Sequence, residues 1–140
     1  MLRVTLDTNI LISGSFWTGD SFRILDEIDK KRIICILSKD IIDEYERVIG
    51  CDEIIGKVEN KALILSKVVQ NVILDSELVQ PRIRLNIVKD DPTDNRVIEC
   101  AKAGRSNFLI TNDAHLLTLK EFESIKIVTP KEFLRHFDSR

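Results

Sequence analysis

The sequence predicts an α/β protein in which a parallel β-sheet is covered by helices. Five short apolar runs, most of them rich in β-branched residues, are spaced along the chain, and helical patterns separate most of them. This alternation is typical of a parallel sheet, because parallel strands need long crossover connections. The length of 140 residues, with 44% hydrophobic and 31% charged residues, fits one folded domain over residues 1–140.

The five predicted strands lie at residues 2–6, 33–37, 72–74, 108–110 and 125–128. Two amphipathic helices are predicted between the second and third strands, at 39–50 and about 57–70. A further helix begins around Pro92 and ends near Gly104, and a last one begins at Pro130. Residues 80–89 include RIRLNIV, which alternates like an edge strand but also fits an extended connection.

The charge and cysteine content narrow the class of protein. A net charge of -2 gives no general basic field, although it does not exclude a nucleic-acid substrate. The three cysteines show no C-x-x-C spacing, which favours a reducing compartment. No run approaches the ~20 apolar residues that a membrane span needs, and no secretory signal pattern is present. We therefore expect a cytoplasmic protein with no membrane partner.

Acidic residues follow the predicted strands at positions where catalytic and binding residues are common in parallel sheets. Asp7 comes directly after the first strand, Asp113 follows the strand at 108–110, and Asp94 lies at the start of the helix before that strand. Functional groups of parallel sheets gather beyond the carboxyl ends of the strands. Each residue also has a structural interpretation: Asp7 and Asp113 as helix caps, and Asp91-Pro92-Thr93-Asp94 as a helix start with Asp91 as the N-cap.

Glu44 and Glu46 are further acidic candidates on the helix at 39–50, and helical periodicity does not choose between them. Converging carboxylates repel one another unless a cation lies among them. Oxygen ligands favour Mg²⁺ or Mn²⁺ over Zn²⁺. His115 beside the acidic residues is weak evidence for a ligand, and His136 is weaker.

Four segments resemble the PIN-domain family in order, spacing and context: LDTNILISG, SKDIIDEYERVI, DPTDNRVIECAKAG and FLITNDAHLL. The nearest relatives by this resemblance are small stand-alone bacterial and archaeal PIN proteins, often assigned as the toxins of toxin-antitoxin pairs. The resemblance implies a three-layer α/β/α fold with a parallel sheet of order 3-2-1-4-5. It also implies a metal-dependent ribonuclease.

Carried onto this chain, the family's catalytic and metal-binding acidic residues are Asp7, Glu44, Asp94 and Asp113. The resemblance thus selects Glu44 over Glu46. It assigns Asn9 and Thr111 a supporting role, through hydrogen bonds to carboxylates or to metal-bound water. Asp91 is then a cap rather than a ligand. One position departs from the pattern, because many relatives carry an aspartate where this chain has His115.

The implied reaction is Mg²⁺- or Mn²⁺-dependent hydrolysis of single-stranded or structured RNA, leaving a 5′ phosphate and a 3′ hydroxyl. The implied partners are an antitoxin that covers the acidic cleft and a second copy of the chain, with the helices between residues 39 and 70 as an interface. Two alternatives stay open. One is a catalytically impaired PIN-like binding or scaffold protein; the other is an aspartyl-phosphate phosphatase, which would want an aspartate where Asn9 stands.

Overall fold

A computed structural model describes residues 1–14, 19–49, 62–88 and 91–139. Its strands form one sheet of order β3-β2-β1-β4-β6-β5. The strands are β1 (Arg3–Leu6), β2 (Ile34–Ser38), β3 (Glu77–Val79), β4 (Phe108–Ile110), β5 (Glu121–Phe122) and β6 (Ile125–Val128). All neighbouring pairs are parallel except β5 and β6, which are antiparallel.

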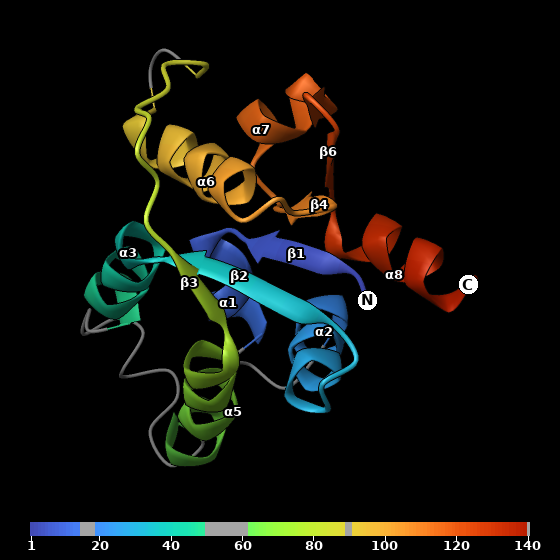
Figure 1. Ribbon diagram of the computed structural model, residues 1–140. Helices are drawn as coiled ribbons and strands as arrows, with labels where there is room; N and C mark the ends of the chain where they lie inside the picture. The colour runs from blue at the N-terminus through green and yellow to red at the C-terminus, as the bar shows by residue number, and fades with distance from the viewer. Residues whose placement is uncertain (15–18, 50–61, 89–90, 140) are drawn as a thin grey trace.

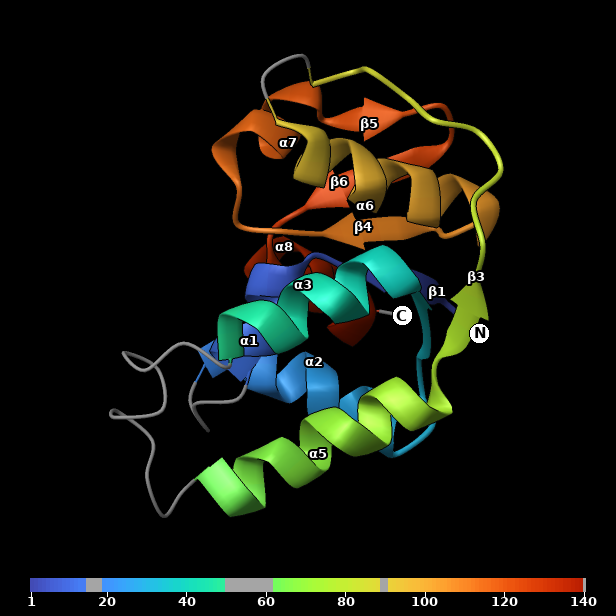
Figure 2. The ribbon, with the colours of Figure 1, turned by 90° about the vertical axis from the view of Figure 1, so that its left-hand side faces the viewer.

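Helices cover both faces of this sheet (Figure 1). They are α1 (Thr8–Gly14), α2 (Gly19–Asp29), α3 (Lys39–Ile49), α5 (Ala62–Asp75), α6 (Pro92–Ala103), α7 (Ala114–Leu119) and α8 (Pro130–Asp138). In Figure 1, α6 and α7 lie on one side of the sheet, and α1, α2, α5 and α8 lie on the other. Figure 2 faces the edge where the parallel strands end, and α1 and α3 lie there. The predicted three-layer α/β/α fold is confirmed.

The predicted strand order is confirmed with one addition. The five parallel strands follow the order 3-2-1-4-5, with β6 as the fifth, and the two-residue strand β5 extends the sheet beyond it. The position predicted for the third strand is wrong. Residues 72–74 form the last part of α5, and the strand begins at Glu77.

The ambiguous segment after β3 is a connection. The described residues 80–88 contain no strand and run along α6. The predicted helix start at Pro92 is confirmed, with Asp91 as the N-cap, and so is the C-cap at Gly104. Pro130 begins α8, where Thr129 and Glu132 form a capping box.

The core lies on both sides of the central strands. Val4, Leu6, Ile36 and Ile110 are completely buried. Helix α6 packs closely against β2 at its end, since a Cβ atom on Gly104 would lie 2.2 Å from Cγ2 of Ile36. Of the helices in the described part of the chain, none has the length and apolar character to cross a membrane.

Candidate metal centre

The carboxyl ends of β1 and β4 bring two of the acidic residues to one place. Leu6 is in register with Ile110, and the backbone N–H of Asp7 donates to the carbonyl oxygen of Ile110 at 3.0 Å. The chain enters α1 after Asp7, whereas β4 continues through Thr111 to Asp113 and α7. In the sheet, β1 lies between β2 and β4, where the strand order reverses; this is where parallel sheets commonly bind ligands.

A cleft of about 300 Å³ opens at this edge. Its lining includes all four acidic residues predicted from sequence: Asp7, Glu44, Asp94 and Asp113. Glu44 reaches it from α3 with 22% of its side chain exposed and forms an ion pair with Arg47. Glu46, the alternative on the same helix, is exposed and does not line the cleft.

Asp7 is buried within a set of hydrogen bonds, with 5% of the residue exposed. The Thr111 hydroxyl donates to Oδ2 of Asp7 at 2.7 Å, and the Asn9 amide donates to the same oxygen at 3.2 Å. The backbone N–H of Asp113 donates to the Thr111 hydroxyl at 2.9 Å, which fixes the two aspartates relative to each other.

Burial raises the pKa of the Asp7 carboxyl, and the charges of Asp113 and Asp91 raise it further. Hydrogen bonds from the Thr111 hydroxyl and the Thr8 backbone lower this pKa and partly offset the increase. The geometry therefore holds Asp7 in place but leaves its negative charge only partly compensated.

Asp94 is the most perturbed acid of the cleft. It is 3% exposed, and its pKa is raised to about 7, first by burial and then by the charges of Asp113, Asp91 and Asp7. Its position in the first turn of α6 directs it toward the neighbouring acidic residues. A carboxyl with this pKa binds a proton readily near neutral pH unless another cation replaces the proton.

Three buried side-chain oxygen atoms of the cleft have no hydrogen-bond partner within the described residues: Thr8 Oγ1, Asn9 Oδ1 and Asp94 Oδ2. Leaving buried polar atoms unpaired is costly, so such atoms mark a place for an ion, water or ligand. All three are hard oxygen donors. The donor set therefore fits Mg²⁺ or Mn²⁺, which prefer carboxylate, amide and hydroxyl oxygen.

Asp91 joins this group although the sequence indicates only a cap. Its Oδ1 accepts the backbone N–H groups of Thr93 and Asp94 at 3.1 and 3.3 Å, as expected of an N-cap. Its carboxylate also lies in the cleft, together with Asp94 and Asp113. The i, i+3 spacing of Asp91 and Asp94 is the only sequence signal for this, since it puts both on one side of the helix start.

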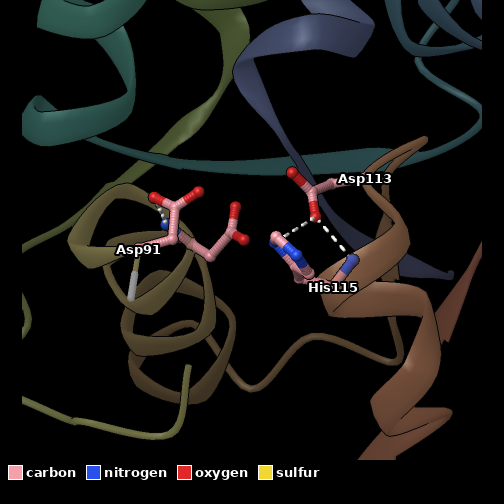
Figure 3. A group of neighbouring side chains, drawn as sticks. Asp91, Asp113 and His115 are labelled. Carbon is pink, nitrogen blue, oxygen red and sulfur yellow. Dashed lines mark hydrogen bonds and ion pairs between the residues drawn. The ribbon is translucent and has the colours of Figure 1, made fainter. Parts of the chain in front are cut away.

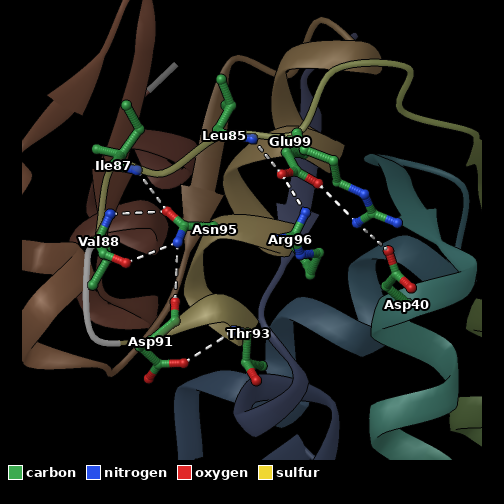
Figure 4. Close-up of polar contacts among 10 residues, drawn as sticks. Asp40, Leu85, Ile87, Val88, Asp91, Thr93, Asn95, Arg96 and Glu99 are labelled. Carbon is green, nitrogen blue, oxygen red and sulfur yellow. Dashed lines mark hydrogen bonds and ion pairs between the residues drawn. The ribbon is translucent and has the colours of Figure 1, made fainter.

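Two buried polar residues of α6 secure this arrangement (Figure 4). Asn95 Oδ1 accepts the backbone N–H groups of Ile87 and Val88 at 2.9 and 2.8 Å, and its Nδ2 donates to the carbonyl oxygens of Val88 and Asp91 at 2.8 and 3.3 Å. The amide thus joins Val88 to Asp91. We call these four bonds the Asn95 clasp.

Glu99 acts one turn further along the helix. Its Oε2 accepts from the backbone of Leu85 at 2.6 Å and from Arg96 at 2.6 Å, and its Oε1 accepts from Arg84 at 3.2 Å. Neither Asn95 nor Glu99 was marked by any sequence pattern as part of the site. Nothing in the spacing of single polar residues on a helix shows that their partner is a remote backbone segment.

A family model described as "PIN domain" matches residues 3–115. This chain belongs to the PIN-domain family. Solved structures show a similar fold: PAE2754 from Pyrobaculum aerophilum matches with a TM-score of 0.67 and 13% identity, over 99% of this chain and 91% of that one.

A second solved structure is that of VapBC2 from Rickettsia felis bound to a DNA fragment from its promoter. It matches this PIN domain with a TM-score of 0.58 and 14% identity. The match covers 91% of this chain and 98% of that one. A search of curated proteins gave no match. At these identities the structural likeness concerns the fold, and the chemistry must be derived from the cleft itself.

Proposed function

We propose that this PIN domain is a metal-dependent endoribonuclease that hydrolyses phosphodiester bonds in single-stranded or structured RNA. One observation carries the proposal: Asp7, Glu44, Asp94 and Asp113 line a single cleft in which buried oxygens lack partners among the described residues. Such a cleft suits a small divalent cation. Membership of the PIN family agrees with this chemistry.

In this proposal Asp7, Asp94 and Asp113 hold Mg²⁺ or Mn²⁺, and Glu44 either binds the ion or orients the attacking water. Asn9 and Thr111 support the site by holding the carboxylate of Asp7 through their hydrogen bonds. When bound, the ion would supply Lewis-acid stabilisation and a more acidic water. Its charge also reverses the local sign, so that a phosphate backbone can approach an acidic cleft.

The first prediction concerns Asp7→Asn. Metal-free protein is incubated with end-labelled single-stranded RNA, hairpin RNA and single-stranded DNA, and Mg²⁺ or Mn²⁺ is then restored. We expect RNA cleavage with a 5′ phosphate on the product, and a loss of at least about 100-fold in rate for Asp7→Asn, because the ion loses a charged ligand. Gel electrophoresis of the products measures both.

Asp75→Asn is the matched control, since Asp75 is an exposed residue at the end of α5 and pairs with Lys31. It should cleave as the unchanged protein does. Circular dichroism confirms that each variant is folded. Cleavage by Asp7→Asn at the unchanged rate, or cleavage without any metal, would reject the proposal. Metal-dependent RNA binding without cleavage would instead favour the binding or scaffold alternative.

We further propose that the protein is the toxin of a toxin-antitoxin pair, acting in the cytoplasm and forming a homodimer. The fold it shares with VapBC2 supports this assignment. An antitoxin segment seated on the acidic cleft would block access to RNA. Co-purification with the product of the neighbouring reading frame tests the antitoxin partner, and inhibition of cleavage by that product tests the blocked cleft. Light scattering of the isolated chain tests the homodimer.

A further inference from the structure

His115 lies beside three acidic residues of the cleft, Asp91, Asp94 and Asp113, and offers an imidazole nitrogen to the same space. It occupies the second position of α7, two residues after the cap residue Asp113. Its imidazole Nδ1 lies 3.8 Å from Oδ1 of Asp113, and 70% of the side chain is exposed. Figure 3 shows Asp113 and His115 together on one side of the space, with Asp91 on the other.

The ligand atoms of Asp91, Asp94, Asp113 and His115 lie within 4.8 Å of one another. Donors on opposite sides of a small divalent ion are separated by about 4.2 Å, twice a bond of about 2.1 Å. Small rotations of the exposed imidazole and of the partly exposed Asp113 carboxylate therefore bring all four donors to a common ion.

A second observation points to a ligand at the same place. Asp94 is 3% exposed, and its Oδ2 has no hydrogen-bond partner within the described residues, although it lines the cleft. The two cap hydrogen bonds of Asp91 both end on Oδ1, so the cap does not engage Oδ2. The start of α6 thus presents carboxylate oxygen atoms that its own cap hydrogen bonds do not engage.

The backbone fixes the place of the histidine. Asp113 Oδ1 accepts the backbone N–H of His115 at 2.8 Å and that of Leu116 at 3.4 Å. Leu116 is completely buried, which anchors α7 to the core. The imidazole therefore extends from a rigid turn beside a carboxylate, and only its side-chain torsions remain to be set by a ligand.

We propose that His115 donates a nitrogen ligand, beside Asp91, Asp94 and Asp113, to a divalent cation in this cleft, and that this nitrogen makes the site prefer Mn²⁺ over Mg²⁺. Imidazole suits first-row transition metals, whereas Mg²⁺ prefers oxygen donors and retains its waters. The inference rests on the metal site of the proposed function. It does not depend on RNA being the substrate.

Mn²⁺ bound to the metal-free full chain provides a direct readout, because pulsed electron paramagnetic resonance detects a nitrogen nucleus coordinated to the ion. We expect a histidine ¹⁴N coupling in the unchanged protein, which changes to the ¹⁵N pattern when only histidine is labelled. The coupling should be absent from His115→Ala and His115→Asp. It should persist in His136→Ala, which removes the other histidine of the chain, on α8 against Phe108.

Calorimetric titration measures the preference. We expect His115→Ala to weaken Mn²⁺ binding about tenfold with little change for Mg²⁺, and His115→Asp to reduce the ratio of Mn²⁺ to Mg²⁺ affinity by a similar factor. Mn²⁺ bound without histidine coupling, or a coupling that survives His115→Ala, would overturn the inference.

The two proposals fail in distinguishable ways. Histidine coupling in a protein that binds Mn²⁺ but cleaves no RNA would support the nitrogen ligand and reject the ribonuclease. RNA cleavage with unchanged metal preference in His115→Ala would do the reverse. A protein that binds neither ion would overturn both.

Discussion

Asp7 and Asp94 are carboxylates that folding removes from water and places near like charges. Burying a carboxylate without a cationic partner is unfavourable, and the raised pKa values of both residues express that cost. At Asp7 the Thr111 hydroxyl offsets part of it. At Asp94 burial and the neighbouring aspartates all act to raise the pKa, and the value of about 7 makes the metal-free cleft sensitive to pH.

The Asp94 carboxyl should make the metal-free protein less stable as pH rises. Its pKa is about 7 in the folded protein and about 3.9 in an unfolded chain, so the folded state binds the extra proton between these values. The resulting stabilisation is complete below about pH 4 and is lost as pH rises through about 7. Urea unfolding in a chelating buffer between about pH 5 and about pH 8 measures it.

Asp94→Asn should flatten this dependence, and Asp75→Asn should leave it unchanged, because Asp75 lies on the surface at the end of α5. Saturating Mn²⁺ should also flatten it in the unchanged protein, since the cation takes the place of the proton. An equally steep loss of stability in Asp94→Asn would show that other groups are responsible.

Among the elements, α6 carries most of the organisation of the site. Its N-cap Asp91 and first-turn Asp94 face the cleft. The next residue, Asn95, and Glu99 one turn later hold the connection from β3. The same helix packs against β1, β2 and β4. Because α6 is held against the sheet, the sheet fixes where Asp91 and Asp94 lie.

Removing the Asn95 clasp should loosen the metal site although Asn95 lies outside the ligand group. Asn95→Ala leaves the backbone N–H groups of Ile87 and Val88 without their acceptor. We expect the free energy of unfolding to fall by about 2 kcal/mol, and the affinity for Mn²⁺ to fall about tenfold as Asp91 loses its fixed position. Urea unfolding and calorimetry measure the two effects.

Asn71→Ala on α5 is a matched control that should leave metal affinity unchanged. If Asn95→Ala is folded and binds Mn²⁺ as tightly as the unchanged protein, the clasp has no influence on the site.

The elements also show where sequence patterns predict well. Central strands such as β1 and β4 are apolar because both of their faces are buried, and the residues that follow them were placed correctly from that signal. The third strand was misplaced because β3 is an edge strand whose Glu77 and Leu78 are exposed. Residues 72–74 form an apolar run like that of a buried strand, because Val72 is a buried residue near the end of an apolar helix.

The same distinction applies within the cleft. Asp7 and Asp113 follow strands, so topology alone predicts that they meet. The place of Asp91 in the cleft and the Asn95 clasp both depend on the path of residues 80–88. These residues run along α6 without forming a helix or strand. The local sequence around a polar residue does not indicate which distant segment of the backbone its side chain will bind.

For the whole molecule, the cleft joins positions 7, 44, 94 and 113, which come from four separate parts of the fold. An ion bound there would link β1, α3, α6 and the loop after β4. Binding that occurs only in the folded state raises stability by mass action. Metal binding and folding are therefore expected to be coupled.

Thermal unfolding tests this coupling. Mn²⁺ at about 100 times its dissociation constant should stabilise the protein by about 2.7 kcal/mol and raise Tm by roughly 10 °C, and excess chelator should reverse the shift. The double variant Asp7→Asn with Asp94→Asn should show no shift, because uncharged amides replace the two buried carboxylates of the cleft. A shift of the same size in the double variant would place the ion elsewhere.

The close packing of Gly104 against Ile36 fixes the end of α6 on β2. The helix that ends there begins at the cleft, and its 12 residues span about 18 Å. A Cβ atom at Gly104 would require either Ile36 or the end of α6 to shift. A shift of this end would tilt α6 and move its other end, where Asp91 and Asp94 lie. The spacing of the acidic residues is thus sensitive to a position remote from the cleft.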